Sequence, residues 1–105
     1  MIQGKMVKIR FKTFYAEQRH WVFVGRVAEF TDSWIKVTGR GIVSLKGQVR
    51  PADVDPEDRT LVIPRENIAH IRILPDTFDV SSIEFTSRGT RAFIRVPDGP
   101  DTSIE

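Results

Sequence analysis

The apolar residues of this 105-residue chain fall in short runs rich in Val, Ile, Phe and Trp, and this spacing constrains the fold more than any other feature. No window of about eleven or more residues holds a helical apolar period between helix caps. Short runs of β-branched and aromatic residues, separated by turn-forming residues, are typical of strands. The sequence therefore predicts an all-β protein, and its length fits one small domain.

Five runs predict five strands, at residues 6–14, 21–30, 34–45, 60–63 and 68–74. In the first, Val7 and Ile9 alternate with basic residues, which predicts a half-buried strand with a basic outer face. Gly25 lies in the middle of the second run, where glycine marks a bend or a close approach of two backbones. Gly39 and Gly41 predict a kink or bulge in the third.

The connections between these runs predict two tight turns and one long loop. Asp32 and Ser33 follow the second run, and their side chains readily bond nearby backbone amides in a turn. Residues 64–67 predict the second tight turn, between the fourth and fifth strands. Residues 46–59 are charged and contain two prolines, which predicts a long loop.

The C-terminal part predicts a hairpin followed by a flexible tail. Residues 82–87 and 90–96 flank Arg88 and Gly89, and a two-residue loop ending in glycine suits a hairpin turn. In that register Ile83 faces Ile94. Residues 97–105 are polar and contain Pro and Gly, which predicts a frayed end.

Two segments carry a resemblance to a known family. Residues 24–37 combine the mid-strand Gly25, a tight turn after Phe30 and an apolar strand that starts at Trp34. Residues 61–71 combine a short strand, a basic turn and a fifth strand. In this order, with a long loop between them, the segments resemble the Sm-like (LSm and Hfq-type) small β-barrels. The resemblance implies a five-stranded, SH3-like barrel over residues 1–77, with residues 78–105 as a C-terminal extension.

The resemblance also implies self-assembly. In Sm-like proteins the fourth strand of one subunit pairs with the fifth strand of the next, which closes a homo-oligomeric ring. A ring removes the open strand edges that would otherwise promote aggregation. The candidate residues for this oligomer interface are Leu61, Ile63, Ile68, His70 and Ile71.

In RNA-binding members of the family, bases stack near the first tight turn and a basic residue of the second turn helps to hold the nucleotide. An aromatic platform, an amide and a guanidinium suit single-stranded RNA. The matching positions here are Phe30, Asp32, Trp34, Arg65 and Asn67.

The chain departs from the family pattern at both turns. Thr31 stands where the family commonly has Asp after the aromatic residue, and the second turn reads Pro-Arg rather than Arg-Gly. Each candidate therefore has a structural alternative. Trp34 can pack at the start of its strand, Arg65 can pair with Glu66, and Asp32 and Asn67 can stabilise their turns.

Composition excludes several chemistries and favours none. The chain has no cysteine, which excludes disulfides, cysteine-based zinc sites and iron–sulfur clusters. Its two histidines, His20 and His70, have no carboxylate at ligand spacing, and no nucleophile elbow or phosphate-binding glycine loop is present. The acidic residues between positions 53 and 58 lack the pattern of a calcium loop and suit a solvated loop. We expect neither an enzyme nor a metal or cofactor.

The charge is uneven: residues 1–50 carry ten Lys or Arg and three Asp or Glu, whereas residues 51–105 carry six and eleven. A basic half can hold phosphates, although interleaved strands can also mix the two halves. No apolar run is long enough to span a membrane, and no signal-peptide core is evident, so a cytoplasmic protein without a membrane partner is expected.

Three functional hypotheses follow. The leading one is an Sm-like ring that binds single-stranded RNA at its pore or on one face. The alternative is a ring that serves only as an assembly or protein-interaction module. A third is a monomeric SH3-like barrel that binds a peptide.

Overall fold

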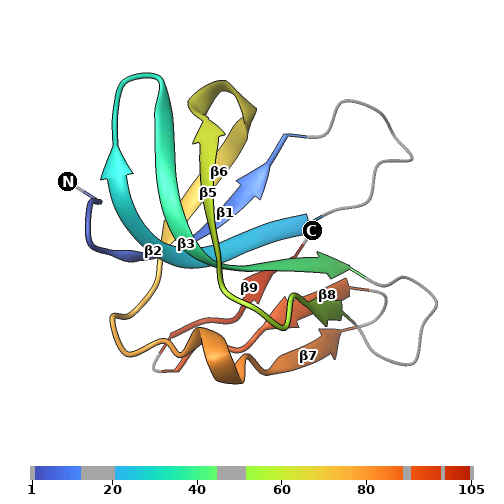
Figure 1. Cartoon of the computed structure of the whole chain (residues 1–105). Coiled ribbons are helices and arrows are strands. Elements are labelled where there is room, and N and C mark those ends of the chain that lie inside the picture. The colour runs from blue at the N-terminus through green and yellow to red at the C-terminus, as the bar shows by residue number, and fades with distance from the viewer. Residues whose placement is uncertain (1, 13–20, 45–51, 89–90, 98, 105) are drawn as a thin grey trace.

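The computed structural model describes residues 2–12, 21–44, 52–88, 91–97 and 99–104. They form two antiparallel sheets and two three-residue 3₁₀ helices (Figure 1), which confirms the all-β prediction. Neither helix is long or apolar enough to cross a membrane, within the described ranges. The main sheet holds β1 (Met6–Phe11), β2 (Trp21–Phe30), β3 (Trp34–Ser44), β4 (Ala52–Val54), β5 (Arg59–Pro64) and β6 (Ile68–Ile73). The smaller sheet holds β7 (Phe85–Arg88), β8 (Arg91–Ile94) and β9 (Thr102–Ser103), and the helices are η1 (Arg65–Asn67) and η2 (Val80–Ser82).

The main sheet has the order β6-β1-β2-β3, and two strands share the outer edge of β3. Its first half pairs with β5 and its last residues pair with β4, so β4 and β5 act as one interrupted strand. At the interruption the Asp55 amide donates to the Gly41 carbonyl over 2.9 Å, and Arg40 pairs with Asp58 over 2.8 Å. Residues 46–51 of the predicted loop lie outside the described residues. The prediction of one long loop is wrong for the rest of its range, because residues 52–54 pair with β3 and Arg59 begins β5.

The sheet is strongly curved, as β2 and β3 bend together in Figure 1. Among the described residues no strand pairing joins β5 to β6, so the sheet is open where a closed barrel would meet.

The bend is built on a glycine pair. Gly25 of β2 lies directly opposite Gly39 of β3. A Cβ atom on Gly39 would lie 2.0 Å from the Val24 carbonyl oxygen, and one on Gly25 would lie 2.3 Å from the Thr38 oxygen. The close backbone approach predicted at Gly25 is thus confirmed. Gly41 lies in a wider place, where a Cβ would only touch the Trp21 ring at 3.7 Å.

Each face of the main sheet covers its own hydrophobic core, because alternate residues of a strand point to opposite faces. We call the concave side the inner face; its core contains Val7, Ile9, Phe23, Val27, Ile35, Val37 and Ile63. The outer face carries a second core of Met6, Val22, Val24 and Ile42, which the C-terminal part covers with Leu74, Phe78, Ile94, Val96 and Ile104.

The C-terminal hairpin is present, but its register differs from the predicted one. Ile94 lies opposite Phe85, not opposite Ile83. The shift arises because Arg88 pairs with Arg91 in the ladder instead of lying in the turn, which moves each partner by two residues. Before the hairpin, η2 is capped by the Asp79 carboxylate, which accepts from the Ser81 amide at 2.9 Å and from the Ser81 hydroxyl at 2.6 Å. This capped turn uses residues 80–82, so the strand begins only at Phe85.

The predicted flexible tail is wrong. Residues 102–103 form β9, which pairs with β8 through Phe93–Ser103 and Ile94–Thr102. Ile104 is fully buried in the outer core. Polar composition predicted fraying, but the pairing with β8 and the burial of Ile104 order the described part of this segment.

Two basic side chains tie this segment to the main sheet. Lys8 Nζ donates to the Ser103 carbonyl over 2.9 Å, and Arg72 Nη2 donates to the Pro100 carbonyl over 2.7 Å. Lys8 is 3% exposed. Burial lowers its pKa to about 8, and the positive charges of Arg72 and Arg10 act in the same direction.

Gly39→Ala should destabilise the fold by about 3 kcal/mol or more, because the new methyl group meets backbone atoms that cannot rotate away. Gly41→Ala is the matched control and should change stability by less than about 1 kcal/mol. Urea unfolding followed by circular dichroism measures both. Equal stability of the two variants would contradict the crossing described at Gly25 and Gly39.

The stability of the protein should rise with pH above about 8. The pKa of Lys8 is about 8 when folded and near its ordinary value of 10.5 when unfolded, so the unfolded chain binds more protons between these limits. Lys8→Met removes this titration. The expected result is a smaller rise in the free energy of unfolding between pH 8 and 10 for the variant, and parallel curves for the two proteins would refute it.

Candidate functional site

The two turns singled out in the sequence lie side by side at one end of the main sheet (Figure 1, top). The Arg65 amide at the start of η1 donates to the Ser33 carbonyl in the β2–β3 turn over 3.0 Å. Trp34 and Pro64 face each other where β3 meets β5. These contacts fix the position of the second turn relative to the first.

Arg65 is held in this end of the sheet by two contacts. Its guanidinium carbon lies 4.5 Å from the centre of the Phe30 ring, which is a cation–π geometry. Its Nη1 donates to the Thr31 carbonyl over 3.0 Å. The side chain remains exposed, so the guanidinium is oriented by the fold and still open to solvent.

The β2–β3 turn is stabilised by a residue other than the predicted ones. The Thr31 hydroxyl accepts from the Ser33 amide at 3.3 Å and from the Trp34 amide at 3.1 Å. Thr31 precedes the two turn residues, so its hydroxyl can accept hydrogen bonds from two consecutive backbone amides. An Asp carboxylate at this position would make the same contacts. Asp32 is exposed, and its side chain bonds no other described residue.

Phe30 and Trp34 do not form one aromatic surface. Phe30 lies opposite Ile35, and Ile35 is fully buried in the inner core. Trp34 and Lys36 flank Ile35 in the strand, so they belong to the outer face. The structure therefore brings Phe30 together with Arg65 and leaves the partly exposed Trp34 on the other side.

Asn67 joins this end of the sheet to β1. It ends η1, and its carbonyl accepts from the Lys12 amide over 2.9 Å. The side chain is partly buried. Phe11, one residue before Lys12, stacks on Trp21 with ring centres 4.1 Å apart, which fixes the end of β1.

The predicted interface residues lie on the two edge strands, but most of their side chains point inward. Leu61, Ile63, Ile68 and Ile71 belong to the inner core or pack against it. His70 is exposed.

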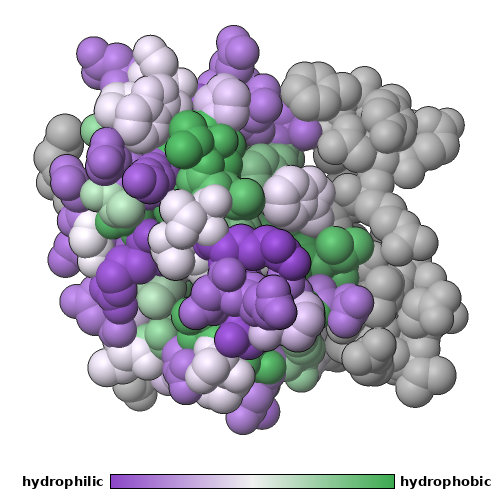
Figure 2. Space-filling model, in the orientation of Figure 1, coloured by the Kyte–Doolittle hydropathy of each residue, from purple (hydrophilic) through white to green (hydrophobic). Residues whose placement is uncertain are grey.

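Among the described residues, the large apolar side chains left in solvent are Val62 of β5, 59% exposed, and Ile73 of β6, 54% exposed. Figure 2 shows hydrophobic surface over the part of the sheet where β5 runs. Strand alternation in the sequence could have identified Val62, which stands between two inward residues. No local signal marks Ile73.

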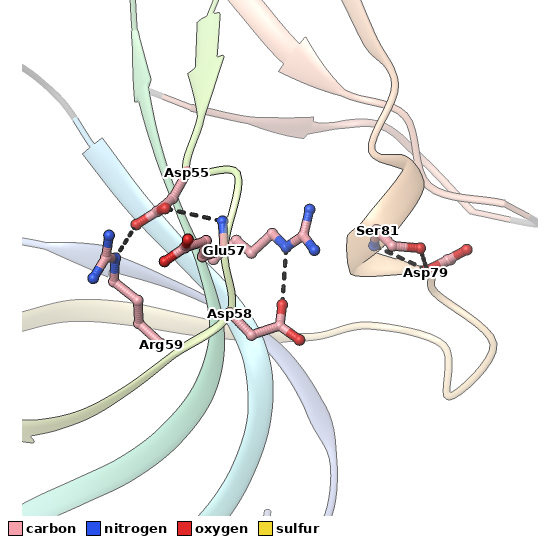
Figure 3. A network of polar contacts seen from close by, with 7 residues as sticks. Asp55, Glu57, Asp58, Arg59, Asp79 and Ser81 are labelled. Atoms are coloured by element: carbon pink, nitrogen blue, oxygen red, sulfur yellow. Dashed lines mark hydrogen bonds and ion pairs between the residues drawn. The ribbon is translucent and has the colours of Figure 1, made fainter.

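A separate polar network braces the interruption between β4 and β5 (Figure 3). The Asp55 carboxylate bonds Arg59 and accepts from the Glu57 amide at 3.1 Å, and both contacts hold the pKa of Asp55 below its usual value. Asp58 pairs with Arg40. The acidic segment thus has a structural role, and the described residues include no group of three side chains placed to hold a metal.

A groove of about 520 Å³ lies between η2 and the loop before β9. Its carboxylates have partners within the chain. Asp79 binds the Ser81 and Ser82 hydroxyls, and Glu84 lies 3.7 Å from Arg95. The groove therefore offers no convergent set of open polar groups.

Comparison with known proteins adds no relative: no family model, curated protein or solved structure matches this chain.

Proposed function

We propose that this chain is a self-assembling subunit of the Sm-like kind, in which β5 of one copy pairs with β6 of the next to close a ring. The proposal depends on one observation. Among the described strands, β5 pairs only with β3 and β6 only with β1, so each has one edge without a strand partner. Such edges present open amide and carbonyl groups to another chain.

The order of the strands supports this pairing. β5 and β6 are the two ends of the path β6-β1-β2-β3-β5, in which every pairing is antiparallel. Joining two different edges is a head-to-tail contact, which gives a closed ring when the rotation between copies is suitable. The strand order and the short turn between β5 and β6 agree with the barrel that the sequence resemblance implies.

Exposed apolar side chains on the same strands also favour association. Val62 and Ile73 are each more than half exposed in the single chain. Completing the burial of one such side chain contributes about 1 kcal/mol. Neither β5 nor β6 carries a lysine, the residue that commonly protects an open edge.

Light scattering after gel filtration, at low and high salt, should give a stable mass of several subunits. Backbone pairing and apolar contact depend little on salt, so the mass should be the same in both buffers. Val62→Lys and Ile73→Lys should each lower the mass, because a lysine would have to be buried at the new contact.

Ala28→Lys is the control, since Ala28 is exposed on the interior strand β2 and should leave the mass unchanged. A wild-type particle near 12.0 kDa would rule out the ring and favour a monomeric barrel with a peptide partner.

The second candidate function is weak binding of single-stranded RNA at the turn end of the sheet. The observation that favours it is the exposed Arg65 guanidinium, which Phe30 and the Thr31 carbonyl hold in one orientation. A fixed guanidinium can contact a phosphate or stack on a base without a further loss of side-chain freedom. In a ring this group would recur once per subunit.

Fluorescence anisotropy with labelled oligo-uridylate at low salt tests this function. We expect affinity that falls as salt is raised, and about tenfold weaker binding for Arg65→Gln. Arg95→Gln is the control, because Arg95 directly follows β8 of the smaller sheet and lies beside Glu84. Absence of binding at low salt would exclude the RNA-binding function. The function would then be that of an assembly module that binds no nucleic acid.

A further inference from the structure

Four basic side chains form a block on the outer face of β1 and β6. Lys8 lies opposite Arg72, and Arg10 lies opposite His70 in the same ladder. Residues directly opposite each other in an antiparallel pair share a face, and two steps along a strand return to that face. Like charges in this arrangement repel each other, so the block is unfavourable for the isolated chain.

Half of the block has a structural role. Lys8 and Arg72 donate to the carbonyls of Ser103 and Pro100, which holds the C-terminal segment on the sheet. Neither basic group is therefore neutralised by the backbone contact that it makes, since a carbonyl carries no net charge.

The other half of the block is available to a ligand. Arg10 is partly exposed and His70 is exposed. Neither forms a hydrogen bond or an ion pair with another described residue. The Arg10 guanidinium and the His70 imidazole thus lie on opposite members of one pair in the ladder, two residues along each strand from Lys8 and Arg72.

The charges that act at this place, among the described residues, are positive. Partial burial and the charges of Lys8 and Arg10 lower the pKa of His70, and among the described residues no carboxylate opposes them. The same holds for Lys8, where the acting charges are Arg72 and Arg10. An anion placed here would be attracted by Lys8, Arg10 and Arg72, would favour the protonated form of His70, and would relieve the repulsion between these groups.

We propose that Arg10 and His70 form a binding site for a phosphate group. The guanidinium offers two parallel N–H donors that match phosphate oxygens, and the imidazolium offers a third donor from the neighbouring strand. The site is on the outer face, whereas the pair of Phe30 and Arg65 is on the inner side of the sheet. It requires neither the ring nor the RNA contact proposed above. Free phosphate compounds and a nucleic-acid backbone share this chemistry.

Nuclear magnetic resonance of the His70 ring tests the site directly. Inorganic phosphate is added near pH 6.5 at constant ionic strength, with chloride as the replaced anion, and His70→Gln assigns the resonance. We expect a saturable shift and a rise in the pKa of His70, because a bound anion favours the imidazolium. Arg10→Gln should weaken binding at least about tenfold.

Two variants make the result specific. Arg10→Lys keeps the charge but loses the paired donors, so its affinity should lie between those of the wild type and Arg10→Gln. Arg26→Gln is the control, because Arg26 lies on β2, where it bonds the Gly4 carbonyl and Asp76. Its titration should match the wild type.

A second titration with oligo-uridylate that carries no terminal phosphate identifies the source of the phosphate group. A saturable His70 shift with inorganic phosphate supports a site for free phosphate compounds, and one with the oligonucleotide supports a backbone contact. No saturable shift with either, or a response unchanged by Arg10→Gln, would overturn the proposal. The mass measurement is independent, so failure of this site and failure of the ring are distinguishable.

Discussion

The close crossing of β2 and β3 at Gly25 and Gly39 is the constraint on which the rest of the structure depends. Because no side chain separates the two backbones there, both strands bend together. Before the crossing, β2 contributes Val22 and Val24 to the outer core. Beyond it, the strands curl around the inner core and carry the β2–β3 turn to η1, where Arg65 can reach Phe30.

A sheet that is apolar on both faces needs cover on both faces, and curvature can supply only one of them. The inner face is enclosed by the bend of the main sheet itself. The outer face is covered by described C-terminal residues that include Leu74, Phe78 and Val96, with Ile94 and Ile104 fully buried against it. This explains why Lys8 of β1 can be buried. The C-terminal segment that covers its amine also supplies the Ser103 carbonyl, which accepts a hydrogen bond from that amine.

Local patterns in the sequence predicted the strands and the close approach at Gly25, because alternation and glycine placement are local properties. They could not predict the separation of Phe30 from Trp34. A shift of register between Val27 and Glu29 places Phe30 opposite Ile35 on the inner face, and one extra residue in a strand moves every later side chain to the other face. Local patterns could not predict that β9 is ordered either. Ile104 belongs to one core cluster with Ile94 and Val22, and only the tertiary structure brings these residues together.

The two proposals make compatible demands on β6. Edge pairing uses backbone groups in the plane of the sheet, whereas His70 and Arg10 stand on its outer face. If β5 of a neighbouring copy lies beside β6, its outer-face residues are Thr60, Val62 and Pro64, because these pair with the outer-face residues of β3. None of the three carries a charge. Assembly would therefore shield the edge and leave the basic block without a carboxylate from β5, so its need for an external anion would persist in the ring.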